Sequence, residues 1–404
     1  MIIAPASSAG QRGVSRVAFY GWIALAFQAF VLASWAIRHY ALHDKSAPMV
    51  GIDFGIFWAA ARVTQEHGAA AIFSARWMQP IEASVRTSTS YAPLPYPPTF
   101  LLAILPFGLL PFSAAFALFE VIGIAAYSAA IAVLSRNIDR STVIVIAAFP
   151  GIALAIFAGQ NSLLTVAAAG SALALMGSNP LLAGACVAVL TIKPQFGMLF
   201  PLALLCGRQW KMLIASTVCS IAFVGISAAA LGTHAWTAFV AYLPEFSQIA
   251  LLQGRDHWCG MPTVFAAARL AGLSVHIAYA AYALVAVPAA VVTAYLWWVD
   301  ARFDLRAAAL VIATLLAQPY MMSYDLLWLA LAIVFLVRDS KTQRLSRWEW
   351  ALLGAAWLMP FESAFSAAQD FPYQLGPAVS LGLLGMVVHR HLMANPNLSL
   401  FRAR

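Results

Sequence analysis

Long apolar runs separated by short polar segments fill most of the chain. The first run, residues 17–37, is long enough to cross a bilayer, for which about 20 apolar residues suffice. It also exceeds the apolar core of a secretory signal peptide, so it predicts an uncleaved signal-anchor with its N-terminus inside. Further runs lie at 98–112, 113–135, 141–158, 162–177, 180–206, 212–231, 276–299, 306–320, 323–338, 348–365 and 376–392.

Hydrophobic side chains make up 63% of the 404 residues and charged side chains only 9%. A soluble domain carries about 25% charged residues, so this composition excludes a soluble globular protein. The runs leave no room for a separate soluble domain, and they lack the strand alternation of a membrane barrel. We therefore predict an all-α, polytopic integral membrane helical bundle, a single transmembrane domain over residues 1–404 with about 10–12 membrane helices.

The net charge of +8 comes from basic residues in the short segments between the runs. Such clusters mark cytoplasmic loops and do not favour a nucleic-acid partner. They predict a multi-pass protein of the inner (plasma) membrane with both termini cytoplasmic and with residues 38–96, 232–262 and 318–325 outside. The clusters are Arg12/Arg16, Arg136/Arg140, Arg208/Lys211, Arg302/Arg306, 338–347 and 389–404.

The longest polar interval, residues 38–96, predicts two amphipathic helices in the first extracytoplasmic loop. Residues 54–67 have aromatic and small apolar side chains at helical spacing, and Trp77, Ile81 and Val85 follow the same pattern. Both segments are typical of helices that lie in the membrane interface with the aromatic face towards the bilayer.

Several runs are shorter than the roughly 20 residues that span hydrocarbon, which is typical of broken or re-entrant helices lining a cavity. The middle of the chain can cross the membrane in two ways, that is, with two alternative threadings. Either 98–112 spans the bilayer and 180–206 is one kinked helix, or 98–112 is re-entrant and 180–206 forms two short helices meeting at Lys193-Pro194. We favour the second, which puts Gln160 and Lys193 outside, beside Asp53.

Asp53 follows the first membrane span, in the stretch Gly51-Ile52-Asp53-Phe54. A carboxylate is costly to desolvate and is kept near a membrane mainly where it acts. Asp53 could be the N-cap of a helix that starts at Phe54. It could also be a general base that an acceptor hydroxyl reaches from the outer face. The two roles are compatible.

Two further polar motifs each have a structural and a functional interpretation. Lys193, ahead of Pro194, is either a lysine that snorkels at a helix end or a cation for a lipid phosphate. The adjacent amides of Gln160 and Asn161 form either an ordinary turn or a pair that hydrogen-bonds sugar hydroxyls.

The remaining motifs are weaker. Tyr96, ahead of two prolines, most simply starts a helix from the aromatic belt, Tyr324-Asp325 caps a helix, and His257 lies in a solvated loop. No catalytic triad, metalloprotease or phosphate-loop pattern occurs in the sequence. The four cysteines show neither metal nor disulfide spacing.

In their order and spacing these motifs resemble glycosyltransferase family 87, the polyprenol-phosphate-mannose-dependent α-mannosyltransferases of GT-C type. The resemblance is tightest over residues 50–211 and looser as far as Asp325. The late turn departs from it, because the family tends to carry a histidine there and this chain has none. The motifs are Asp53-Phe54, Gly68 to Phe73, Tyr96-Pro97-Pro98, Gly159 to Leu164, Gly184, Lys193-Pro194-Gln195 and Gly207 to Lys211.

The resemblance implies an inverting hexosyl transfer, without metal or cofactor, from a polyprenyl-phosphate sugar to an acceptor hydroxyl on the extracytoplasmic side. The acceptor is a lipid, a glycan or a glycolipid. Asp53 is the implied general base. The residues implied to bind the donor phosphate or sugar are Lys193, Gln160, Asn161, Tyr96, Gln195, Tyr324 and Asp325.

Two other functions fit an apolar bundle with broken helices. One is a transporter or a lipid-linked glycan flippase, against which stand the long first outer loop and the lack of an internal repeat. The other is a membrane scaffold with degenerate catalytic residues.

Overall fold

The structure is a computed structural model that describes residues 16–44, 46–85, 91–136 and 138–395. Helices make up 80% of it, and no strand occurs in the described ranges, which confirms the all-α fold class. The α-helices are α1 (Arg16–Ala36), α2 (Ile52–His67), α3 (Ala75–Val85), α4 (Pro98–Ile104), α5 (Phe112–Leu134), α6 (Arg140–Ala147), α7 (Pro150–Ala158), α8 (Ser162–Leu175), α9 (Pro180–Val189), α10 (Leu199–Cys206), α11 (Trp210–Leu231), α12 (Thr233–Ser247), α13 (Arg255–Trp258), α14 (Val264–Leu270), α15 (Val275–Trp298), α16 (Phe303–Leu316), α17 (Leu329–Asp339), α18 (Arg347–Ala368) and α19 (Gly376–Ala394). The short 3₁₀ and π segments are η1 (Ile37–Ala41), η2 (Ala69–Phe73), η3 (Leu105–Leu109), η4 (Leu190–Ile192), η5 (Pro194–Phe196), η6 (Gln248–Leu252) and η7 (Ser323–Trp328).

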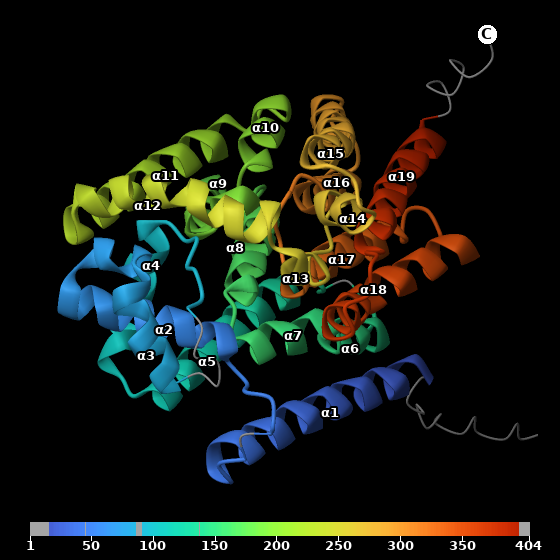
Figure 1. Cartoon of the computed structure of the whole chain (residues 1–404). Coiled ribbons are helices and arrows are strands. Elements are labelled where there is room, and N and C mark those ends of the chain that lie inside the picture. The colour runs from blue at the N-terminus through green and yellow to red at the C-terminus, as the bar shows by residue number, and fades with distance from the viewer. Residues whose placement is uncertain (1–15, 45, 86–90, 137, 396–404) are drawn as a thin grey trace, which may run out of the picture.

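Six of the described helical segments are long and apolar enough to cross a membrane, so the chain is a polytopic membrane protein. In Figure 1 the start of α1 and the end of α19 both lie on the right, whereas α2 and α3 lie on the left. The candidate spans are Arg16–Ala41, Phe112–Leu134, Arg140–Ala158, Trp210–Leu231, Val275–Trp298 and Arg347–Ala368.

The apolar run 180–206 is broken in the middle, as the second threading predicts. α9 ends at Val189, α10 begins at Leu199, and two short 3₁₀ turns lie between them. Lys193 has an extended backbone (φ −143°, ψ 72°) because the proline that follows it disfavours the helical conformation. A single kinked helix over this run is therefore wrong, and the break leaves Lys193 at the junction of two short helices.

α2 begins two residues earlier than the N-cap interpretation of Asp53 requires. The N-cap is Gly51, whose positive φ of 86° suits glycine, and Asp53 lies in the first helical turn. Interpreting Asp53 as the N-cap is therefore wrong. Its carboxylate accepts a hydrogen bond from Gln160, which is 107 residues away in the sequence.

The aromatic face of α2 is directed into the protein, not towards the bilayer. Phe54 and Phe57 are almost fully buried among the rings of the segments that follow. The expectation that this face contacts lipid is therefore wrong, although the helix itself is where the pattern predicted it. The partner rings are Tyr96, Phe100, Phe107, Phe112, Phe116 and Phe119.

α16 and α17 form the centre of the bundle. Eleven of the fourteen residues of α16 are buried, and nearly all of α17 is too. At the C-terminal end of α17, Asp339 forms an ion pair with the buried Arg390. The Arg390 Nε lies 2.7 Å from the Asp339 carboxylate. At the opposite end, η7 leads into α17 and carries Asp325. The loop just before η7 lines a cavity.

Candidate active site

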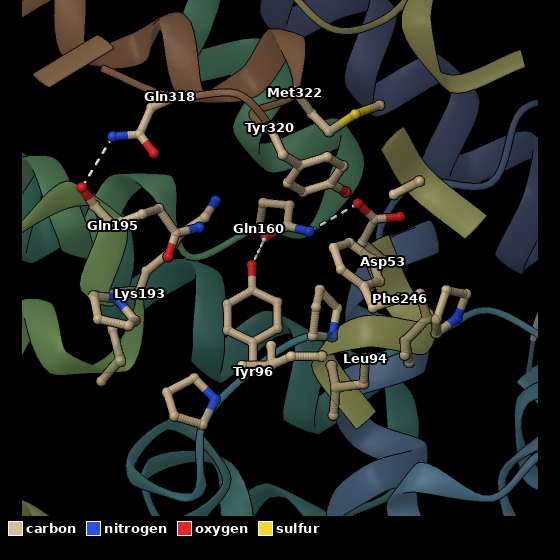
Figure 2. A pocket seen from close by; sticks show the side chains of 18 of the residues that line it. Asp53, Leu94, Tyr96, Gln160, Lys193, Gln195, Phe246, Gln318, Tyr320 and Met322 are labelled. Atoms are coloured by element: carbon tan, nitrogen blue, oxygen red, sulfur yellow. Dashed lines mark hydrogen bonds between the residues drawn. The ribbon is translucent and has the colours of Figure 1, made fainter. Parts of the chain in front are cut away.

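A cavity of about 540 Å³ collects polar side chains from segments that are far apart in the sequence (Figure 2). Six of the eight predicted site residues line it: Asp53, Tyr96, Gln160, Lys193, Gln195 and Tyr324. The other two, Asn161 and Asp325, are at most 1% exposed and lie behind the wall. The remaining lining residues are Ile56, Phe57, Ala92, Pro93, Leu94, Pro95, Pro97, Ile192, Pro194, Met198, Phe239, Leu243, Phe246, Ile249, Ala250, His257, Gln318, Pro319, Tyr320 and Met322.

The position of Asp53 is fixed by the way α2 meets the end of α7. The backbone N–H of Gly51 donates to the Phe157 carbonyl oxygen over 2.7 Å, which holds the start of α2 against the turn after α7. Gln160, in that turn, donates from Nε2 to Asp53 Oδ2 over 2.8 Å. The carboxylate is therefore held on the cavity wall by a neutral donor.

Tyr96 orients Gln160 from the other side. Its hydroxyl donates to Gln160 Oε1 over 3.0 Å, and burial raises the pKa of Tyr96 well above its ordinary value. Tyr96 therefore stays protonated at neutral pH and acts as the donor. Since the amide oxygen of Gln160 accepts from Tyr96, its nitrogen is the group directed at Asp53.

Lys193 forms a buried ion pair with Asp325. Its Nζ lies 2.6 and 2.9 Å from the two carboxylate oxygens, and the two side chains are 5% and 1% exposed. Ser162 Oγ also donates to Asp325, over 2.7 Å. The interpretation of Lys193 as a snorkelling lysine is therefore wrong, because a snorkelling ammonium lies in water.

The Lys193 ammonium is still accessible from the cavity. It lies 5.9 Å from the ring centroid of Tyr96, 5.1 Å from that of Phe196 and 5.3 Å from that of Tyr324. An ammonium has three N–H donors, and two contacts to Asp325 leave at least one for a ligand. Among the described residues that line the cavity, Lys193 is the only lysine or arginine.

Asn161 does not join Gln160 in the cavity. It is completely buried, and its side chain lies beside the Tyr96 hydroxyl. Of the two adjacent amides proposed to hydrogen-bond sugar hydroxyls, only that of Gln160 lines the cavity. Gln195 lines the cavity and also accepts a hydrogen bond at its backbone carbonyl.

One wall of the cavity is apolar and continues onto the outer surface. Leu243 and Met198 line the cavity while remaining 40% and 63% exposed. The spacing of Phe239, Leu243 and Phe246 is that of one helix face, so a search for amphipathic helices within 232–262 could have found this wall. An exposed apolar surface of this kind can bind a lipid chain.

Three polar lining residues were not predicted as site residues. Gln318 and Tyr320 flank Pro319 in the turn after α16, and His257 comes from the short helix α13. The only local signal for them is that both segments are expected on the same side of the membrane as Asp53. In the described residues, no three histidine, cysteine, aspartate or glutamate side chains gather in a way that could hold a metal ion.

The sequence model of glycosyltransferase family 87 matches residues 94–319, which is more than half of the chain. The match includes Tyr96, Gln160 and Lys193, whereas Asp53 and Asp325 lie outside it. No curated protein and no solved structure matches the chain. The chain therefore belongs to glycosyltransferase family 87 and is a membrane glycosyltransferase.

Proposed function

We propose that the protein transfers a hexose, in the first instance mannose, from a polyprenyl-phosphate sugar to a hydroxyl of a lipid, glycan or glycolipid acceptor. Transfer inverts the anomeric centre and uses neither metal nor cofactor. The observation that carries the proposal is the position of Asp53 on the cavity wall, where Gln160 holds it across the cavity from Lys193 (Figure 2).

Asp53 acts as the general base. It takes the proton of the acceptor hydroxyl while that oxygen bonds to the anomeric carbon of the donor. The bond from the anomeric carbon to the phosphate oxygen breaks, and polyprenyl phosphate leaves with the electron pair. Attack and departure on opposite faces of the sugar invert the centre, and a base and a cation on opposite sides of one cavity support this geometry.

Lys193 stabilises the charge that develops on the leaving phosphate. A cation in a cavity shielded from water stabilises a developing negative charge more strongly than the same cation in bulk solvent. Asp325 holds the ammonium in place between turnovers. The apolar wall of Leu243, Phe246 and Met198 offers the polyprenyl chain a path from the bilayer to the cavity.

The other predicted residues divide into two groups. Tyr96 and Gln160 orient Asp53, and Gln160 has a second N–H that a sugar hydroxyl can accept. Gln195 and Tyr324 contact the donor from the Lys193 side. Asn161 and Asp325 support these residues from behind the wall.

The cavity faces the extracytoplasmic side in this proposal, with both termini cytoplasmic in the plasma membrane and one transmembrane domain over residues 1–404. The positive-inside bias supports this orientation, since the basic clusters avoid the segments that line the cavity. Donor and acceptor then meet on the side where lipid-linked sugars are displayed for envelope assembly.

The test is sugar transfer from radiolabelled polyprenyl-phosphate mannose by purified wild-type protein and Asp53→Asn. Asparagine keeps an oxygen that can accept from Gln160 but cannot take a proton. We expect transfer to fall about 10²- to 10⁴-fold at unchanged folded yield. The matched control is Asp44→Asn, which removes another acid of the same outer loop.

Asp44 is solvent-accessible, and hydrogen bonds from Ser46 and Arg38 lower its pKa to about 2. It does not line the cavity, so its asparagine variant should transfer sugar normally. Wild-type transfer by Asp53→Asn would overturn the general-base assignment. Movement of intact lipid-linked sugar across vesicles, without transfer, would instead support the flippase.

A further inference from the structure

Gln318 presents a fixed acceptor to the cavity. It follows the end of α16, is 2% exposed and lines the cavity. Its Nε2 donates to two backbone carbonyl oxygens, that of Gln195 over 2.9 Å and that of Thr314 over 2.8 Å. A side-chain amide nitrogen has two hydrogens, so both are used.

The two carbonyls decide which way the amide faces. The Gln318 backbone N–H bonds to Leu315 instead of Thr314, which leaves the Thr314 carbonyl for the side chain. Exchanging the amide nitrogen and oxygen would bring an oxygen against two carbonyl oxygens. Oε1 is therefore directed away from Gln195 (Figure 2), and it can accept a hydrogen bond but cannot donate one.

We infer that Gln318 is a specificity-determining residue whose Oε1 accepts a hydrogen bond from one hydroxyl of the donor sugar. The inference rests on the proposed function. Gln318 is hydrogen-bonded to the backbone of Gln195, and Gln195 is two residues from Lys193 in the sequence. Gln318 therefore lies on the side of the cavity where the donor phosphate is proposed to bind. Asp53, the proposed base for the acceptor, lies on the other side of Tyr96 and Gln160 (Figure 2).

An acceptor held in this way discriminates against sugars that lack the hydroxyl. A deoxy donor would leave a buried carbonyl oxygen unpaired, which lowers kcat/KM by roughly 10- to 100-fold. The effect falls on the ring position whose hydroxyl donates to Oε1 and spares positions whose hydroxyls do not reach it.

The test compares polyprenyl-phosphate mannose with its 2-, 3-, 4- and 6-deoxy analogues. Wild-type protein should discriminate against at least one analogue by roughly 10- to 100-fold. In Gln318→Met, which has similar length and no acceptor oxygen, that ratio should fall close to one. A purely structural loss would lower kcat/KM for all donors equally and leave the ratio unchanged.

The matched control is Gln65→Met. Gln65 also donates to a backbone carbonyl, that of Leu105 over 2.8 Å, but it does not line the cavity. Its variant should keep the wild-type ratio. Discrimination retained by Gln318→Met overturns the inference, and so does a wild-type protein that uses all four analogues as well as mannose, whether or not the variant folds. A wild-type protein that transfers no sugar overturns the proposed function as well.

Discussion

Gly51 and Gly159 lie backbone against backbone where α2 meets the turn after α7. A methyl group added at Gly159 would come within 3.0 Å of the Gly51 Cα and within 2.6 Å of the Phe54 Cβ. Gly159 also has a positive φ of 72°. This close approach brings Asp53 within hydrogen-bond distance of Gln160, so the geometry of the proposed base depends on two residues without side chains.

Gly159→Ala should lower the free energy of unfolding by about 2–4 kcal/mol, because it combines a left-handed backbone conformation with a steric clash. Sugar transfer should fall as Asp53 is pushed away from Gln160. Thermal unfolding in detergent and the transfer rate measure the two effects. The matched control is Gly225→Ala in α11, where an added Cβ meets nothing within 4 Å. Equal melting temperatures for the two variants would contradict this role of Gly159.

Gln160→Glu should move the acidic limb of the pH–rate profile to higher pH. A second carboxylate beside Asp53 disfavours the ionisation of both, and a general base must be ionised to act. Gln160→Met should lower kcat without this pH shift. Gln65→Glu adds the same charge about 18 Å further along α2 and should leave the profile unchanged. An unshifted profile in Gln160→Glu would mean that Asp53 is not the group that limits the rate at low pH.

Removal of one partner of the Lys193–Asp325 pair should destabilise the protein more than removal of both. Asp325→Asn leaves a buried ammonium without its counter-charge, which costs about 3–5 kcal/mol. The double variant Lys193→Met/Asp325→Leu should lose less than the sum of the single variants. Glu66→Gln breaks the exposed Arg62–Glu66 pair and should cost less than about 1 kcal/mol.

The same variants separate folding from donor binding. The double variant should fold yet show a raised donor KM or no turnover, because it lacks the cation proposed for the phosphate. Lys193→Arg should retain part of the activity. A wild-type donor KM in a folded double variant would leave Lys193 as a structural residue only.

Cysteine labelling tests the proposed orientation. In a protein whose four native cysteines are replaced, Thr233→Cys and Gln253→Cys should react with an impermeant maleimide in intact cells. Lys341→Cys should react only after the membrane is opened. All three positions are exposed, so access to the side chain does not limit the reaction. Labelling of Lys341→Cys in intact cells would reverse the orientation.

The sequence by itself determined that the apolar runs are helices, although α12 lies in a segment predicted as a loop. Apolar runs in a chain with so few charges must satisfy their backbone groups internally, and in lipid only helices do so for runs of this kind. Local chemistry also favoured a break at Lys193-Pro194 over one kinked helix, because a proline restricts the residue before it. Six of the eight site residues that the family resemblance implied line one cavity.

Only the tertiary structure decided which polar groups meet and which apolar faces are covered. Asp53 and Gln160 are 107 residues apart, and Lys193 and Asp325 are 132 apart. Both separations in sequence are too long for a local sequence pattern to predict the contact. The face of α2 around Phe54 was expected to contact the bilayer but is buried in the protein. The bilayer interior and the protein interior are both apolar, so a hydrophobic pattern cannot distinguish them.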